Sequence, residues 1–78
     1  MGYNKGEFKY EILQPLGRLS ADSSGNYTKE VNLIAYRDSD AVIDIRKWNR
    51  ETDTMLKGIT LSREEALKLK DILHEYLG

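Results

Sequence analysis

The chain has 78 residues, enough for one domain, and below ~80 residues a single hydrophobic core rarely contributes more than about 3–5 kcal/mol. It has no cysteine and one histidine, so neither a disulfide nor a structural zinc site can add stability. A net charge of −1 with 40% hydrophobic residues excludes a disordered chain and gives no basic surplus for nucleic acid. We therefore expect a folded protein stabilised by association, with the homodimer as the default oligomer.

The sequence contains no segment that is apolar and long enough to span a bilayer. Residues Met1–Gly6 lack the apolar segment of a secretory signal. We expect residues 1–6 to form a flexible N-terminus, residues 7–78 to form a single domain, and the protein to be cytoplasmic.

The first half of the chain alternates between apolar and polar residues. This alternation predicts one strand from Phe8 to about Ser20 and a second strand over residues 27–37, with a turn at residues 21–26. Pro15 cannot donate a hydrogen bond to a ladder, so it must lie at an edge or a bulge. The first strand should therefore bend there.

A turn at residues 37–40 precedes a third predicted strand at residues 41–48. A polar loop at residues 49–54 leads to the fourth strand at residues 55–61. In the third strand the side chains alternate between two faces. Ile43 and Ile45 share one face, and the other carries Asp44, Arg46 and Trp48.

The last segment changes to a helical period. Ser62 and Glu65 have the spacing of a capping box, and the helix that follows ends at Gly78. Apolar residues recur at helical spacing: Ala66, Leu69, Ile72, Leu73, Tyr76 and Leu77. The predicted fold class is α+β, a curved four-stranded antiparallel meander followed by one C-terminal helix. Since one helix covers only one face of such a sheet, the other must meet solvent, a partner or a ligand.

Catalytic signatures are missing from the sequence. The single histidine, His74, lies near the end of the predicted helix, where a surface or interface side chain is expected. No glycine-rich phosphate-binding pattern precedes a helix. We expect no enzymatic activity, no cofactor and no metal site.

The segment from Asp44 to Trp48 has the pattern of a binding face. Arg46 and Trp48 project from the same side of the third strand and combine a cation with a large aromatic ring. Bases stack on aromatic rings for about 1–3 kcal/mol each, while basic side chains contact the phosphates. Alternatively, Trp48 closes one end of the core and Arg46 forms an ion pair with Asp44 or Glu30.

Two blocks of sequence carry a family resemblance. Val42-Ile-Asp-Ile-Arg-Lys-Trp48, followed by Lys57-Gly-Ile-Thr-Leu-Ser62 and a helix, resembles the C-terminal domain of transcriptional positive cofactor 4. The first half, with Phe8-Lys-Tyr-Glu-Ile12 and Thr28-Lys-Glu-Val-Asn-Leu33, is similar to small bacterial members of that family, the YdbC type. The resemblance extends over roughly residues 7–75. It implies a homodimer whose curved sheets form grooves for single-stranded DNA, with the helices packed together at the dimer interface.

The resemblance also implies roles for individual residues. Arg46 matches a residue that contacts the backbone, Trp48 an aromatic that stacks on bases, and Lys57 a phosphate contact. Lys47 departs from the pattern, since eukaryotic members often have two adjacent aromatic residues here. The expected nucleic-acid-binding residues are Arg46, Trp48, Lys57, Lys29, Asn32, Lys9, Tyr27 and Tyr36. The expected dimer interface is on the helix, at Leu69, Ile72, Leu73 and Tyr76.

These observations predict a homodimer that binds single-stranded DNA, and possibly RNA, with little sequence preference. The resemblance implies a role in transcription regulation or DNA maintenance, with transcription or DNA-processing proteins as further partners. The alternative is a protein-interaction module that uses the exposed sheet face of the same dimer. Salt dependence separates the two, because single-strand binding has a log–log slope of roughly −0.7 per phosphate contacted.

Overall fold

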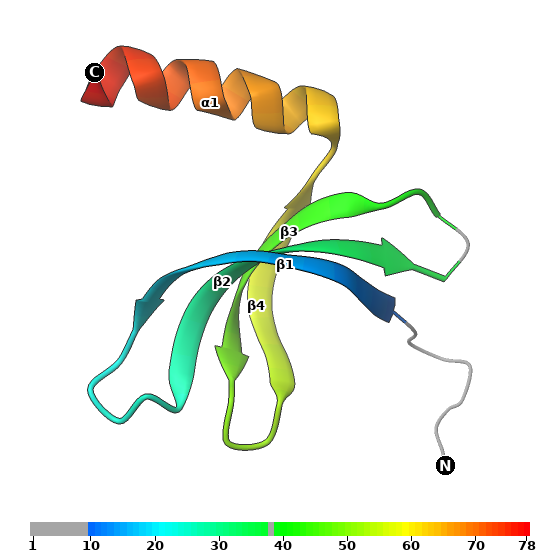
Figure 1. Ribbon diagram of the computed structural model, residues 1–78, viewed down its shortest axis with the longest axis vertical. Helices are drawn as coiled ribbons and strands as arrows, with labels where there is room; N and C mark the ends of the chain where they lie inside the picture. Colours follow the sequence, from blue (N-terminus) through cyan, green and yellow to red (C-terminus); the bar gives the residue numbers. More distant parts are fainter. Residues whose placement is uncertain (1–9, 38) are drawn as a thin grey trace.

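The computed structural model describes residues 10–37 and 39–78; the expected N-terminal segment 1–6, Phe8 and Lys9 lie outside the described residues. Four strands form one antiparallel sheet in the order β1-β2-β3-β4, followed by one helix (Figure 1). The predicted fold class is thereby confirmed. The elements are β1 (Tyr10–Ala21), β2 (Tyr27–Tyr36), β3 (Val42–Asn49), β4 (Thr54–Leu61) and α1 (Arg63–Leu77).

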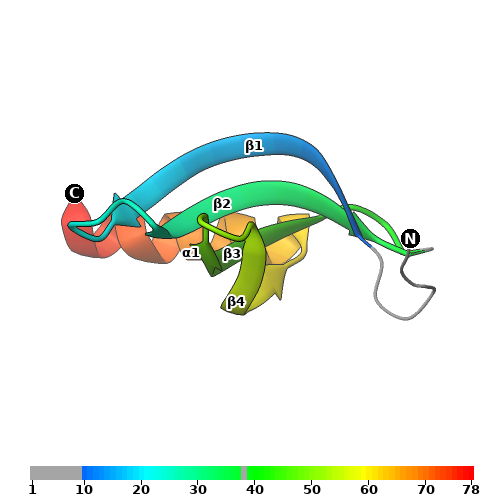
Figure 2. The same ribbon diagram turned by 90° about the horizontal axis from the view of Figure 1, so that it is seen from below.

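The sheet is strongly curled. β1 arches across the front of the other strands at a steep angle to β4 (Figures 1 and 2). The register between β1 and β2 shifts three times, and each shift leaves one β1 leucine out of the pairing: Leu13, Leu16 and Leu19. Extra residues on one strand bend it and increase its twist. The predicted bend at Pro15 coincides with one of these shifts, between Pro15 and Gly17.

The β1–β2 turn is closed by the carboxylate of Asp22. It accepts hydrogen bonds from the Ser24 hydroxyl at 2.9 Å, the Gly25 amide at 3.0 Å and the Tyr27 amide at 3.2 Å. These bonds, that from Ser24 above all, lower the pKa of Asp22. Gly25 has a φ of 80°, a conformation that a glycine adopts without steric cost. The turn expected at residues 21–26 is therefore present for the expected chemical reason.

β4 passes very close to β3 at Gly58, which pairs with Arg46. A Cβ atom at this position would lie 2.0 Å from Cβ of Arg46 and 2.6 Å from the carbonyl oxygen of Ile45. No side chain fits in this space without a shift of the backbone. The glycine of the Lys-Gly-Ile-Thr-Leu segment is thus a steric requirement of the sheet.

The sheet has two faces of different chemistry. We call the first the ion-pair face, formed by Thr28, Glu30, Asn32, Ile34, Asp44, Arg46 and Trp48. The second, the lysine face, consists of Lys29, Val31, Leu33, Ile43, Ile45, Lys47, Lys57 and Ile59. The only buried hydrophobic residues in the described part of the chain, Ile34 and Trp48, lie on the ion-pair face. The predicted division of β3 into two sets of side chains is confirmed.

The helix α1 begins with the predicted capping box. The Glu65 amide donates to the Ser62 hydroxyl at 3.1 Å, and the Ser62 amide donates to the Glu65 carboxylate at 2.9 Å. The helix contacts only β3 and β4 and has no buried residue. No helix in residues 10–37 and 39–78 is long and apolar enough to cross a membrane.

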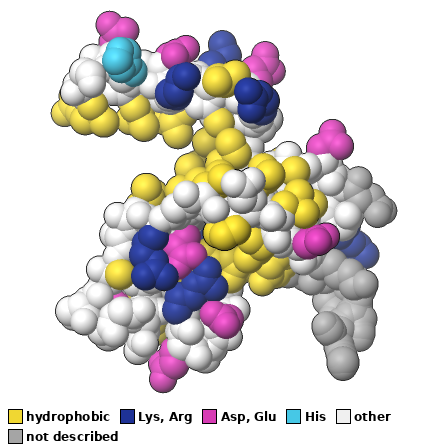
Figure 3. Space-filling model, viewed as in Figure 1, with side chains coloured by type: hydrophobic (Ala, Val, Ile, Leu, Met, Phe, Trp, Pro, Cys, Tyr) yellow, Lys and Arg dark blue, Asp and Glu magenta, His cyan; other side chains and the backbone are white. Residues whose placement is uncertain are grey.

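The expectation that the helix covers one face of the sheet is wrong. β4 leads into α1 through Ser62 alone, with extended φ and ψ of −69° and 167°, so no loop turns the helix back. The helix extends away from the sheet, and hydrophobic side chains line the side of α1 that is nearer the sheet (Figure 3). Its apolar residues are therefore largely open to solvent in a single copy of the chain.

Replacing Gly58 by alanine should destabilise the fold by about 1–3 kcal/mol, the usual cost of forcing extra atoms into a packed site. Gly17 offers a matched control, because a Cβ there would have no neighbour within 4 Å. Urea unfolding of both variants measures the difference. Equal stability of Gly58→Ala and Gly17→Ala would contradict the close approach of β3 and β4.

Candidate nucleic-acid interface

The carboxylate of Glu30 organises one end of the ion-pair face. It lies on β2, is 7% exposed, and accepts hydrogen bonds from Arg50 Nε at 3.1 Å and from Arg50 Nη2. The hydroxyl of Thr28 donates to Glu30 at 2.6 Å, and Arg18 from β1 approaches it at 3.4 Å. A bidentate arginine contact of this kind is among the strongest that a carboxylate makes.

The electrostatics of this cluster favour the ionised carboxylate. The hydrogen bonds from Arg50, helped by that from Thr28, lower the pKa of Glu30 from its ordinary 4.5 to about 2. The same hydrogen bonds raise the pKa of Arg50. Both groups therefore stay charged at neutral pH, and each neutralises the other.

A second buried carboxylate holds Arg46. Asp44 is 0% exposed and accepts two hydrogen bonds from the Arg46 guanidinium, both at 2.6 Å. The hydroxyl of Tyr36 donates to Asp44 at 2.8 Å, and burial together with this bond raises the pKa of Tyr36 to about 12. Arg46 also donates to the carbonyl oxygen of Leu56 in β4 at 2.9 Å. Its guanidinium thus joins β3 to β4.

Trp48 is buried beneath this polar layer. Only 1% of the residue is exposed, and the Arg50 guanidinium lies over its ring at 4.1 Å from the centroid. The ring of Tyr10 in β1 packs against it edge-on, at a centroid distance of 6.4 Å. With Arg50 over the ring and only 1% of the residue exposed, Trp48 has no free face for a base.

The expectation of an exposed Arg46–Trp48 binding face is therefore wrong for this structure. The two residues do share one side of β3, but it is the packed side, since β1 curls over it. The alternative considered from sequence, a core tryptophan with an Arg46–Asp44 ion pair, is the observed arrangement. Two other predicted contacts lie on the same packed side: Asn32 is 2% exposed, and Tyr36 is half-buried against Asp44.

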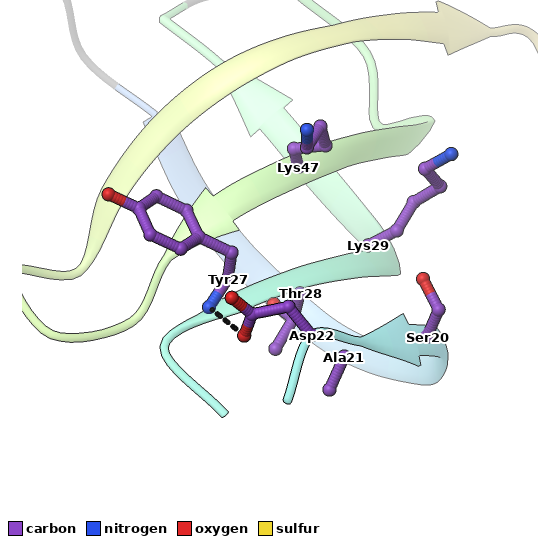
Figure 4. A pocket seen from close by; sticks show the side chains of 7 residues that line it. All are labelled: Ser20, Ala21, Asp22, Tyr27, Thr28, Lys29 and Lys47. Carbon is purple, nitrogen blue, oxygen red and sulfur yellow. Dashed lines mark hydrogen bonds between the residues drawn. The ribbon is translucent and has the colours of Figure 1, made fainter. Parts of the chain in front are cut away.

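The lysine face gathers a different set of side chains. Lys29 of β2 lies directly opposite Lys47 of β3, and both line a pocket with Tyr27 and Ser20 (Figure 4). A neighbouring pocket is also lined by Lys29 and Lys47 and adds Lys57. Tyr27 is 44% exposed, so its ring is accessible beside the lysines. The two pockets form a basic surface from the β1–β2 turn across to β4.

Charge is divided unequally between the two faces. Arg18, Arg46 and Arg50 all form ion pairs with carboxylates on the ion-pair face. By contrast, within residues 10–37 and 39–78, no carboxylate lies within 4.0 Å of the lysine side chains on the lysine face. In the described residues the lysine face is thus a basic surface without ion pairs, even though the sequence is nearly neutral.

Three of the predicted binding residues come together here: Tyr27, Lys29 and Lys57. Lys9 lies outside the described residues. Sequence reasoning missed Lys47, which was noted only as a departure from the family pattern. Its strand alternation with Ile43 and Ile45 was a usable signal, because it places Lys47 on their face.

The structure thus combines a curled antiparallel sheet, an exposed basic surface and one outlying helix. Residues 24–72 match the family model described as transcriptional coactivator p15 (PC4). Over 68 residues the chain is 34% identical to an uncharacterized protein of Treponema pallidum (strain Nichols), covering 87% of this chain and 79% of the relative. The chain belongs to the transcriptional coactivator p15 (PC4) family, whose members have a role in single-stranded DNA binding and transcription.

The Glu30 cluster predicts a specific dependence of stability on pH. Because its pKa is lower in the folded state, Glu30 contributes stability that is complete above about pH 5 and is lost as pH falls from 4.5 towards 2. This contribution amounts to roughly 3 kcal/mol. Glu30→Gln should remove that part of the pH dependence, as measured by urea unfolding at a series of pH values. Glu51→Gln, at an exposed position, is the control, and the two variants having the same pH profile would contradict the assignment.

Proposed function

We propose that this protein binds single-stranded DNA, and also accepts RNA, on the lysine face of a homodimer. The observation that carries the proposal is the division of basic residues: Arg18, Arg46 and Arg50 are held by carboxylates, whereas the lysines of the lysine face are exposed. Phosphates need cations that are not already paired. Membership of the transcriptional coactivator p15 (PC4) family supports the choice of ligand.

Lys29, Lys47 and Lys57 contact successive phosphates, and the Tyr27 ring offers a platform on which a base stacks. Base–aromatic stacking is worth about 1–3 kcal/mol and accepts any base, so little sequence preference is expected. Lysine ammonium groups are compact point charges that contact phosphate without the fixed fork of an arginine. This site acts by binding and not by catalysis.

In this proposal Arg46 and Trp48 lie on the opposite face of the sheet and stabilise the strands that carry the site. Arg46 ties β3 to β4 beneath Lys47 and Lys57, and Trp48 fills the space under β1. Removing Arg46 would leave Asp44 buried without its partner, which typically costs 3–5 kcal/mol. Substitutions at either residue therefore act through folding before they act through binding.

A second copy of the chain completes the fold. Described apolar residues on the helix are widely exposed, including Ile72 at 64%, Leu73 at 44% and Tyr76 at 85%. Together with the half-buried Leu69, these are the residues proposed for the dimer interface. Each copy has one lysine face, so the dimer has two binding sites. The two sites can bind one long strand together or two strands separately. The biological role proposed is transcription regulation or DNA maintenance on melted duplex.

Lys47→Ala should weaken binding to oligo-dT and reduce the log–log salt slope by about 0.7, the value for one lost phosphate contact. Tyr27→Ala should cost about 1–3 kcal/mol of binding for the base that it stacks, with the slope unchanged. Fluorescence anisotropy of a labelled oligonucleotide at several salt concentrations measures both effects.

Lys68→Ala is the matched control, since Lys68 is an exposed lysine on α1, away from the lysine face. Equal losses of affinity for Lys47→Ala and Lys68→Ala would mean that only net charge matters. Salt-independent binding of the unmodified protein would instead favour a protein partner on this face and reject the nucleic-acid site.

A further inference from the structure

We propose that the lysine face carries a seat for the methyl group of thymine, so that it binds a DNA strand with thymine more tightly than the same strand with uracil. The inference rests on the proposed function and names the base that the site favours. The seat consists of three β-branched residues, Val31, Ile45 and Ile59, which we call the aliphatic row.

The aliphatic row crosses three neighbouring strands. Val31 of β2 pairs with Ile45 of β3, and Ile45 pairs with Ile59 of β4. Paired residues of neighbouring strands project from the same face of a sheet, on strands about 4.8 Å apart. Ile59 is 58% exposed, while Val31 and Ile45 are half-buried. The row is therefore a continuous apolar strip on the lysine face that is most open at β4.

The aliphatic row lies directly beside the lysines. Lys29, Lys47 and Lys57 each lie two residues from a member of the row on the same strand, a distance of about 6.7 Å along a strand. A pocket of about 380 Å³ joins the two sets, and its lining includes the three lysines with Ile45 and Ile59. A nucleotide with its phosphate on these lysines therefore has its base within reach of the aliphatic row.

The charge beside the row favours a nucleic acid as the occupant. In the part of the chain that the structure describes, no carboxylate lies within 4.0 Å of these lysine side chains. The surface is thus cationic along one edge and apolar along the other. A single strand of DNA has the complementary division, because its phosphates lie along one edge and its bases along the other.

Aliphatic side chains select a different part of a base from aromatic ones. Tyr27 offers a ring, and a ring accepts the flat face of any base. Valine and isoleucine have no ring, so they gain mainly by removing apolar surface from water. Thymine carries a methyl group on its edge, and apolar side chains are its usual contact. The row therefore favours thymine over uracil, the base that replaces it in RNA.

The test compares oligo-dT with oligo-dU of equal length, which differ only in the methyl group of each base. Fluorescence anisotropy titrations of the unmodified protein at one salt concentration give both dissociation constants. Burial of a methyl group should make oligo-dT bind about fourfold more tightly for each thymine that is seated. Equal affinities for the two oligonucleotides would overturn the proposal.

Two isoleucine variants locate the methyl contact. Ile59→Ala should bring the ratio of the two dissociation constants towards one. Ile12→Ala is the matched control, because Ile12 is 37% exposed and pairs with Ile34 of the ion-pair face, and it should leave the ratio unchanged. A partial loss of folded protein would not change the ratio, since it weakens binding of both oligonucleotides alike. An unchanged ratio in Ile59→Ala would reject the aliphatic row as the seat.

Tyr27→Ala separates the seat from the stacking platform. It should weaken binding of both oligonucleotides by the same factor, because a base stacks on the ring with or without its methyl group. A ratio that fell in Tyr27→Ala and not in Ile59→Ala would assign the preference to stacking and contradict the proposal. Salt-dependent binding with equal affinities would reject the thymine seat alone, whereas no salt-dependent binding of either oligonucleotide would reject the proposed function itself.

Discussion

The pairing of two buried carboxylates with arginines is the interaction on which the rest of this structure depends. Glu30 and Asp44 lie on adjacent strands, and each binds an arginine through two hydrogen bonds. A buried carboxylate without such partners would cost several kcal/mol. The ion pairs therefore determine that β1 packs over the ion-pair face of the sheet.

Several features of the molecule follow from this arrangement. Arg50, fixed by Glu30, covers the ring of Trp48, and Arg46, fixed by Asp44, joins β3 to β4. Both arginines are thereby paired with carboxylates of the ion-pair face. The lysines of the opposite face have no such role and stay accessible, so a chain with a net charge of −1 still presents a basic surface.

Small size explains why the same fold leaves so much apolar surface open. In the described residues only Ile34 and Trp48 are buried hydrophobic side chains, and α1 buries none. A core of this size gives little stability by itself, and the chain has no disulfide to compensate. The homodimer proposed above would cover the exposed apolar residues of the helix.

Much of the fold could be predicted from the sequence because local signals determine it. Alternation located the strands, the Ser62–Glu65 pair located the helix start, and Pro15 located one bulge. The bulges at Leu13 and Leu19 have no proline or glycine as a signal, so they were missed. The position of α1 was missed too, since periodicity defines an apolar side of a helix but not what covers it.

The candidate site was predicted only in part, for a related reason. A period of two divides a strand into two sets of side chains but does not say which set faces the interior. In β3 both sets were plausible, because one holds Ile43 and Ile45 and the other holds Trp48. The buried ion pairs of Glu30 and Asp44 determine that the set with Trp48 faces the interior. These ion pairs depend on contacts between strands, which alternation does not specify.

The most direct test of the central claim is a nuclear magnetic resonance titration of the isotope-labelled protein with oligo-dT. The lysine-face site predicts that the amide signals of Tyr27, Lys29, Lys47 and Lys57 shift most. It also predicts that the indole N–H signal of Trp48, the one tryptophan of the chain, stays nearly constant. If the Trp48 indole and the Arg46 side chain shifted most while the lysine face did not respond, nucleic acid would bind the ion-pair face and the claim would be contradicted.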